Sequence, residues 1–140
     1  MKILIAVDGS AYTKKMLAYL VTHEATLLHG SEFTLLTVQP HLPARAAAVL
    51  DKTIVDSYHL DEAERVLAPV TKFLLRHGVD PKSNWKVGAA GPTIAKFAQQ
   101  GKFDLLVMGS HGHGALANLV LGSVATQVLA NCSVPILIVR

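Results

Sequence analysis

A glycine-rich stretch near the C-terminal end holds the residue types in this sequence that best suit the binding of a phosphate. Residues 109–123 read GSHGHGALANLVLGS, with glycines at Gly109, Gly112, Gly114 and Gly122. Glycine lets backbone amides approach a phosphate closely. The apolar spacing that follows predicts a helix beginning near Ser123, whose N-terminus would add N–H donors and about half a unit of positive charge. The stretch therefore predicts an anion cradle, with the Ser123 hydroxyl as a further hydrogen-bond donor.

A second polar group follows the first apolar run of the chain, where Asp8, Gly9 and Ser10 stand together. A carboxylate at such a turn can either cap the next helix or reach a ligand. We expect Ser10 to cap the helix, which would leave the Asp8 side chain for ligand contact.

Histidine and lysine usage limits the chemistry expected of the glycine-rich stretch. His111 and His113 have a His-x-His spacing, but no third ligand is in view, so we predict no metal site formed by the protein. The two imidazoles would either donate hydrogen bonds to phosphates or face solvent. No lysine stands among residues 109–123, so the P-loop pattern of strong phosphate transfer is missing. We therefore predict no catalytic residues and at most slow turnover.

Apolar runs alternate with the segments that carry these residues. Five runs stand out, namely KILIAV (2–7), FTLLTV (33–38), NWKVG (84–88), DLLVMG (104–109) and PILIV (135–139). Nearly continuous apolar runs are typical of strands buried on both faces, and the segments between them have helical spacing. The alternation predicts an α/β fold with a doubly wound, Rossmann-like, five-stranded parallel sheet and helices on both faces. Such sheets bind ligands beyond the carboxyl ends of their strands, where the two polar loops would meet.

Two segments fit this pattern less well. Pro69 lies inside an apolar helical pattern, so we expect either a kink there or two shorter helices. Residues 39–55 contain two prolines and no clear period, and we expect them to form a mobile connection beside the carboxyl edge of the sheet.

Composition bounds the remaining possibilities. A chain of 140 residues, 51% of them hydrophobic, fits a single domain over residues 1–140. Its 13 basic and 10 acidic side chains give a net charge of +3 but form no basic stripe, so we expect no nucleic-acid partner. The single cysteine cannot form an internal disulfide, and the N-terminal residues begin a strand rather than a secretory signal. We expect a cytoplasmic protein with no membrane partner.

Three stretches resemble the universal stress protein family in its ATP-binding branch. They are the opening ILIAVDGS, the central VGAAGPTIAKFAQQGKFDLLVMGSHGHGAL and the ending LGSVATQVLANCSVPILIV. The specific part is the spacing of Gly109, Gly112 and Gly122-Ser123, with two and then nine residues between the glycines. The resemblance covers nearly the whole chain and implies a fold of the adenine nucleotide alpha hydrolase type.

The resemblance also implies roles for particular positions. In the family, the acidic residue that ends the first strand reaches the adenine or ribose and falls on Asp8, with Ala6 beside it. The adenine contact at the end of the second strand falls on Val38. The contacts to ribose and phosphates after the fourth strand fall on Met108, Gly109, Gly112, Gly122, Ser123 and Val124. His111, within the same loop, completes the candidate binding residues.

The same resemblance implies a ligand and a partner. The expected ligand is ATP, with AMP or ADP as alternatives, accompanied by Mg²⁺. The family pairs subunits through the last strand, which implies a homodimer through residues Val134 to Val139.

Three functions compete on this basis. The first is an ATP-binding stress-response regulator with little or no turnover. The second is an enzyme of the same architecture, a slow ATPase or a nucleotidyltransferase, although the DGSAYTK turn lacks the paired histidines or phosphate loop of such transferases. The third is a dimeric interaction module that binds no nucleotide and uses its glycines only as turns.

Overall fold

The apolar runs form one parallel β-sheet in a computed structural model, which describes residues 1–27, 29–114 and 118–140. The strands are β1 (Lys2–Ala6), β2 (Glu32–Gln39), β3 (Lys82–Val87), β4 (Leu105–Gly109) and β5 (Ile136–Val139). Their order across the sheet is β3-β2-β1-β4-β5, and every neighbouring pair is parallel. The chain winds outward from β1 to β3, returns to the centre, and winds the other way through β4 to β5. The predicted doubly wound sheet is confirmed.

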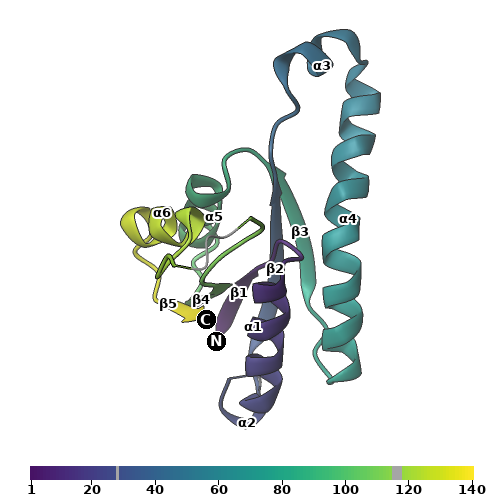
Figure 1. Cartoon of the computed structure of the whole chain (residues 1–140). Helices are drawn as coiled ribbons and strands as arrows, with labels where there is room; N and C mark the ends of the chain where they lie inside the picture. Colours follow the sequence, from purple (N-terminus) through teal and green to yellow (C-terminus); the bar gives the residue numbers. More distant parts are fainter. Residues whose placement is uncertain (28, 115–117) are drawn as a thin grey trace.

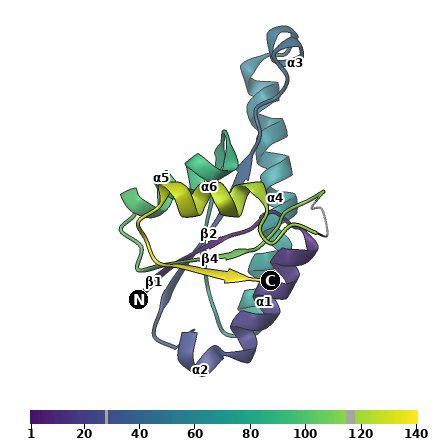
Figure 2. The same cartoon turned by 60° about the vertical axis from the view of Figure 1, so that its left-hand side comes forward.

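Helices cover both faces of the sheet. Within the described ranges they are α1 (Ala11–Thr22), α2 (Glu24–Leu27), α3 (Ala44–Val49), α4 (Lys52–Arg76), α5 (Ala90–Gln100) and α6 (Ser123–Asn131). Figures 1 and 2 show α1 and α4 on one face and α5 and α6 on the other. None of the helices in these ranges combines the length and the apolar character needed to cross a bilayer.

The core has two layers because the strands alternate their side chains between the two faces of the sheet. On β1, Ile3 and Ile5 are fully buried against the α1 and α4 side, where Met16 joins them. Leu4, between them in sequence, is buried on the opposite side with Ile94 of α5. Burial on both faces explains why this strand is apolar at consecutive positions rather than at alternate ones.

Helix α4 runs unbroken through Pro69, so of the two expected alternatives, a kink or two shorter helices, the second is wrong. A proline lacks the N–H that would bond the carbonyl four residues earlier, here that of Arg65. Arg65 and Pro69 are both exposed, so water can satisfy that carbonyl at little cost. Packing on both sides of the proline holds α4 against β2 and β3 through the buried residues His59, Ala63, Leu67, Val70 and Leu74.

Residues 39–55 are more regular than expected. Gln39 ends β2, α3 follows, and α4 begins at Lys52. Helix α3 forms because its sequence, ARAAAV, consists largely of strong helix formers. Figures 1 and 2 show α3 and the first turns of α4 extending beyond the carboxyl edge of the sheet. We call residues 40–58 the arm. The expected loose connection is therefore a helical extension.

Candidate functional site

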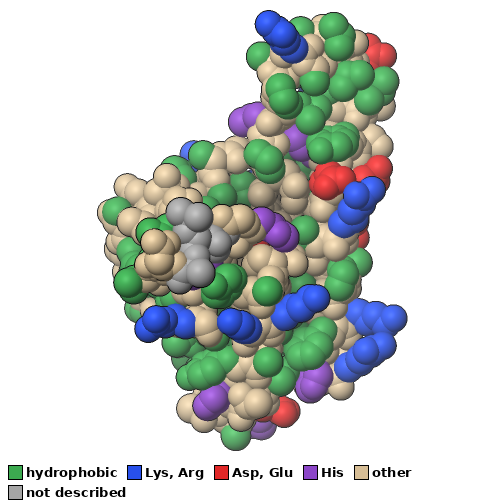
Figure 3. Space-filling model, in the orientation of Figure 1, with side chains coloured by type: hydrophobic (Ala, Val, Ile, Leu, Met, Phe, Trp, Pro, Cys, Tyr) green, Lys and Arg blue, Asp and Glu red, His purple; other side chains and the backbone are tan. Residues whose placement is uncertain are grey.

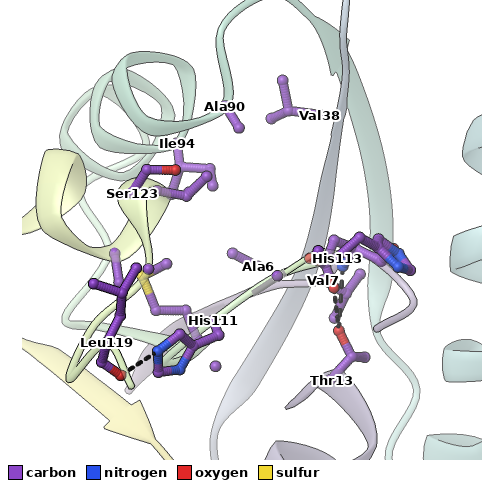
Figure 4. Close-up of a pocket in the computed structure, with 18 residues that line it drawn as sticks. Ala6, Val7, Thr13, Val38, Ala90, Ile94, His111, His113, Leu119 and Ser123 are labelled. Carbon is purple, nitrogen blue, oxygen red and sulfur yellow. Dashed lines mark hydrogen bonds between the residues drawn. The ribbon is translucent and has the colours of Figure 1, made fainter. Parts of the chain in front are cut away.

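A cavity of about 380 Å³ lies at the carboxyl ends of β1, β2 and β4, beside the first residues of α5 and α6. Figure 4 shows side chains from these elements around a common space. The volume falls within the range of about 300–1,000 Å³ that small-molecule sites occupy. This is also the crevice where a doubly wound sheet reverses its winding direction, which is the usual position for a ligand.

The Asp8 carboxylate is held at the end of β1 by two donors. Its Oδ1 accepts hydrogen bonds from the Ser10 backbone N–H at 2.9 Å and from the Thr13 hydroxyl at 3.0 Å. The expectation that Ser10 caps α1 is wrong, because its buried hydroxyl bonds neither the helix nor any other described residue. Asp8 therefore binds the amide of this turn with one oxygen, while its Oδ2 lies beside Gly112 at the cavity.

Gly109, Gly112 and Gly122 are favoured by close approach, whereas Gly114 is favoured by its left-handed φ of +70°. A Cβ added to Gly112 would lie 2.7 Å from Asp8 Oδ2. One added to Gly122 would lie 3.2 Å from the Cα of His111, and one added to Gly109 would lie 2.8 Å from the Cβ of Tyr12. The Gly112 contact joins the loop after β4 to the loop after β1, whereas Gly122 approaches its own loop and Gly109 approaches α1. Residues 115–117 of the predicted loop lie outside the described residues.

His111 fixes the shape of the loop. Its Nε2 donates to the backbone carbonyl of Leu119 at 2.8 Å, and its Nδ1 bonds the buried Ser110 hydroxyl at 2.8 Å. Figure 4 shows the first of these bonds as a dashed line. Both ring nitrogens are thus engaged within the protein, so His111 positions the loop rather than donating to a ligand.

His113 joins the two polar loops. Its Nε2 donates to the backbone carbonyl of Asp8 at 2.7 Å, across 105 positions of sequence. His113 also lines the cavity and is largely exposed. It therefore ties the loop after β4 to the loop after β1.

The N-terminus of α6 supplies the polar wall of the cavity. Gly122 precedes the helix, and its carbonyl accepts the Thr126 N–H at 3.0 Å. The N–H groups of Ser123, Val124 and Ala125 come before that first intrahelical donor and have no acceptor within the helix. All three residues line the cavity, so the amides that have no acceptor within the helix lie at the cavity together with the positive end of the helix dipole.

The opposite wall is apolar. Ala6 and Met108, at the ends of β1 and β4, form the floor of the cavity, and Val38 at the end of β2 closes one side of it. Ala90 of α5 faces Val38, and Ile94 lies further along α5, as Figure 4 shows. The cavity can therefore hold a flat apolar group on one side and an anion on the other.

Comparison with known proteins agrees with this geometry. The model of the universal stress protein family matches residues 1–140. This chain belongs to the universal stress protein family. It is 33% identical over 139 residues to the universal stress protein Slr1230 of Synechocystis, which covers 99% of this chain and 42% of that protein. A universal stress protein of Thermus aquaticus is 30% identical over 139 residues, covering 99% and 97%. The chain spans less than half the length of Slr1230, and its matched segments cover 47% and 49% of two relatives from Methanocaldococcus jannaschii.

Solved structures of the family share the fold. The structure of protein MJ0577 of Methanocaldococcus jannaschii superposes with a TM-score of 0.82 at 27% identity, covering 99% of this chain and 94% of that one. A universal stress protein from Lactobacillus plantarum gives a TM-score of 0.76 at 22% identity, with coverage of 100% and 97%.

All the candidate binding residues of this family member surround one cavity. They are Ala6, Asp8, Val38, Met108, Gly109, His111, Gly112, Gly122, Ser123 and Val124. The sequence prediction missed other lining residues, namely Val7, Thr13, Ala90, Ile94, Leu119 and Ala125. Their types carry no chemical signal, but the start of a helix after β3 could have pointed to Ala90 and Ile94. No group of three or more metal-binding side chains occurs in the described ranges.

Proposed function

We propose that this chain is a cytoplasmic stress-response regulator that binds ATP, together with Mg²⁺, in the cavity at the carboxyl edge and turns it over slowly or not at all. One observation carries the proposal. The cavity has an apolar wall on one side and the N-terminus of α6 on the other. The apolar wall suits a flat adenine ring, and the helix N-terminus suits negatively charged phosphates. AMP and ADP fit the same arrangement less completely, because they leave part of the polar wall without a partner.

The adenine would lie between Val38 of β2 and the start of α5. Ala90 and Ile94 present apolar surface there, and the small side chain of Ala6 leaves room for a ring above the sheet. Asp8 Oδ2 would accept a hydrogen bond from a ribose hydroxyl, because Oδ1 is already occupied by two donors. A ribose between these groups directs the phosphates toward the loop after β4.

The phosphates would meet amides rather than cationic side chains. Ser123, Val124 and Ala125 offer three backbone N–H groups, and the exposed Ser123 hydroxyl adds a fourth donor. No lysine or arginine is found among the described residues that line the cavity. Mg²⁺ would therefore supply most of the neutralising charge, held by phosphate oxygens and water as this ion prefers.

Structures of other family members support the choice of an adenine nucleotide. Universal stress proteins of known structure include one in complex with cyclic AMP, one from Arabidopsis thaliana with AMP bound and one from Archaeoglobus fulgidus in complex with dAMP. They are 16–20% identical to this chain with TM-scores of 0.65–0.71, so they support the fold directly and the ligand only by analogy.

Slow turnover follows from what surrounds the phosphates. Fast phosphoryl transfer needs a charge stabiliser and a group that orients the attacking oxygen. The nitrogens of His111 are both engaged, and Nε2 of His113 bonds the Asp8 carbonyl. The described residues that line the cavity include no lysine or arginine to stabilise charge on the phosphates, which favours a regulator over an ATPase or nucleotidyltransferase.

A homodimer through the last strand is part of the proposal. β5 is the outer strand of the sheet and pairs with β4 on one side, so its other edge presents backbone donors and acceptors. Ile136, Leu137 and Ile138 are half-buried there. A second β5 would cover this apolar edge, and light scattering at tens of micromolar would detect the dimer.

Two measurements test nucleotide binding. Small molecules released from the purified protein by mild denaturation, identified by mass, should include an adenine nucleotide. The nucleotide-free protein should then melt at a higher temperature with ATP and Mg²⁺, because a ligand at about 100 times its Kd stabilises the folded state by roughly 2.7 kcal/mol. GTP serves as the control for base recognition. An empty protein whose melting temperature is unchanged by ATP, ADP and AMP would refute the proposal in favour of a nucleotide-free module.

A further inference from the structure

The outer face of α4 carries a regular stripe of exposed side chains. The inner face packs on β2 and β3, and Figure 1 shows no element on the opposite side of the helix. The stripe consists of Asp51, Ile54, Tyr58, Asp61, Arg65, Ala68, Lys72 and Leu75, at alternating intervals of three and four residues. Such intervals define the contact line of helices that pack along their length. Ile54, Tyr58 and Leu75 are 51%, 47% and 51% exposed, which is unusual for large apolar groups gathered on one line.

Charge divides this outer stripe into two halves. Asp51 and Asp61 lie in the N-terminal half, and Arg65 and Lys72 lie in the C-terminal half. Figure 3 shows acidic side chains over the middle of α4 and basic ones over its lower part. A second copy of the helix in parallel orientation would set like charges against each other. An antiparallel copy would set the acidic half of each helix against the basic half of the other.

Shape divides the outer stripe in the same way. Tyr58 protrudes from the N-terminal half, whereas Ala68 in the C-terminal half has a small side chain. Ala68 borders a shallow hollow at the flank of α4 facing β3, lined by Glu64, Leu67, Ala68, Thr71, Lys72, Leu75, Arg76 and Ser83. Ten residues of helix separate Tyr58 from Ala68, a distance of about 15 Å along the axis. An antiparallel copy related by a two-fold axis near residue 63 would bring each Tyr58 against the Ala68 of its partner. The same register brings each Asp61 opposite an Arg65 and overlaps the two helices along their whole length.

We propose that the outer stripe of α4 is an antiparallel docking surface for a second copy of this chain. The contact is isologous, because the same residues contribute from both copies. A helix of 25 residues is about 37 Å long and about 10 Å across, so it offers roughly 400 Å², about half of the roughly 800 Å² per partner of a standard interface. Association through it is therefore weak and dependent on concentration. Figure 1 shows α4 and β5 at opposite edges of the sheet, so this contact neither requires nor blocks pairing through β5.

Removal of the protruding ring gives the first test. Tyr58→Ser and its matched control Tyr19→Ser, which removes a partly exposed tyrosine from α1, are compared with the parent by light scattering and sedimentation equilibrium up to submillimolar concentration. Tyr58→Ser should lower the mass at the highest concentrations to the mass that β5 pairing alone gives, while Tyr19→Ser should not. Ile54→Ser should act like Tyr58→Ser. Equal masses for the parent and both stripe variants would overturn the proposal.

Charge reversal tests the antiparallel register. Asp61→Arg and Arg65→Asp should each weaken association about tenfold, since two symmetric exposed pairs become repulsive. The double variant should restore association to within a few-fold of the parent. Arg65 also pairs with Glu62 on its own helix at 3.3 Å, so thermal unfolding checks that each variant keeps its fold. A folded double variant that associates as weakly as the single variants would exclude this register. Nucleotide binding is not involved in any of these results.

Discussion

The glycine-rich loop after β4 and the arm after β2 leave the same edge of the sheet, yet their residues are constrained very differently. In the loop, an added Cβ at Gly112 or Gly122 would press on Asp8 or on the backbone of residues 110–111. In the arm, Val49 is 82% exposed, and no residue of α3 is buried. The neighbours of the loop therefore decide its sequence, whereas helix propensity and solvent decide that of the arm.

This contrast separates two kinds of substitution. A change in the loop should alter nucleotide affinity through the position of a few atoms, because His113 bonds the Asp8 carbonyl and so ties the loop to the turn that holds the Asp8 carboxylate. A change in the arm should alter neither affinity nor stability unless it removes a docking contact. The substitutions below test this contrast, from the largest expected effect on ATP affinity to the smallest expected effect on stability.

The largest effect is expected for Gly112→Val. The first added carbon would already lie 2.7 Å from Asp8 Oδ2, and forced overpacking costs roughly 1–3 kcal/mol even before the cavity is narrowed. ATP affinity should fall about 100-fold, measured by calorimetry. Asp8→Ala, combined with Gly112→Val in a double-mutant cycle, identifies the cause. If the clash with Asp8 matters, the double variant loses less affinity than the sum of the two single losses; strict additivity would contradict this.

A smaller but cleaner loss is expected for Ser123→Asp. Ser123 is the exposed first residue of α6, where a carboxylate interacts favourably with the helix dipole by roughly 0.3–1 kcal/mol, so the fold should keep its stability. A phosphate about 4 Å away would be repelled by roughly 4 kcal/mol at an effective dielectric of 20. Screened by solvent and Mg²⁺, this should weaken ATP binding by about one to two orders of magnitude.

Gln100→Glu is the control for Ser123→Asp. It adds the same charge at the exposed end of α5, away from the cavity, and should leave ATP affinity unchanged. Tight ATP binding by Ser123→Asp, at the affinity of the parent, would mean that the phosphates do not lie at the start of α6.

A few-fold loss is expected for His113→Ala. The variant removes the bond from His113 Nε2 to the Asp8 carbonyl, and one such bond contributes roughly 0.5–1.5 kcal/mol to the closed arrangement of the two loops. ATP affinity should therefore fall about 2- to 10-fold. His77→Ala is the matched control, since its ring also bonds a backbone carbonyl, that of Phe73 at 2.9 Å, away from the cavity. Equal affinities for the two variants would show that the tie between the loops does not support the site.

The fold was predictable because its signals are strong and redundant. Buried strands such as residues 2–7 are apolar at consecutive positions, and the segments between them have helical spacing. The candidate site was predictable in part for a different reason. Glycines at close contacts and a serine at a helix start are residue types that can be recognised in the sequence and matched to the pattern of a family.

Other features depend on geometry that residue types do not encode. Asp8 and Ser10 are both good capping residues, and only the turn decides that the Asp8 carboxylate binds the Ser10 N–H. Ala90 and Ile94 look like ordinary helix residues, and their place at the cavity follows from the packing of α5 beside β2. The arm was missed because its prolines concealed the strong helix propensity of the alanines that follow.

The smallest effect is expected for Val49→Ser, in the arm. Val49 is 82% exposed, so its methyl groups already face water, and surface changes of this kind are usually within about 0.5 kcal/mol. Val70→Ser is the matched control on the inner face of α4, where valine is 4% exposed and its burial is worth roughly 1.5–3 kcal/mol. Val70→Ser should lower the melting temperature by several degrees and Val49→Ser by less than about two, with ATP affinity unchanged for Val49→Ser. A marked fall for Val49→Ser at low protein concentration would mean that the arm packs within its own chain. A fall that appears only at high concentration would instead mean that the tip of the arm belongs to the contact between copies.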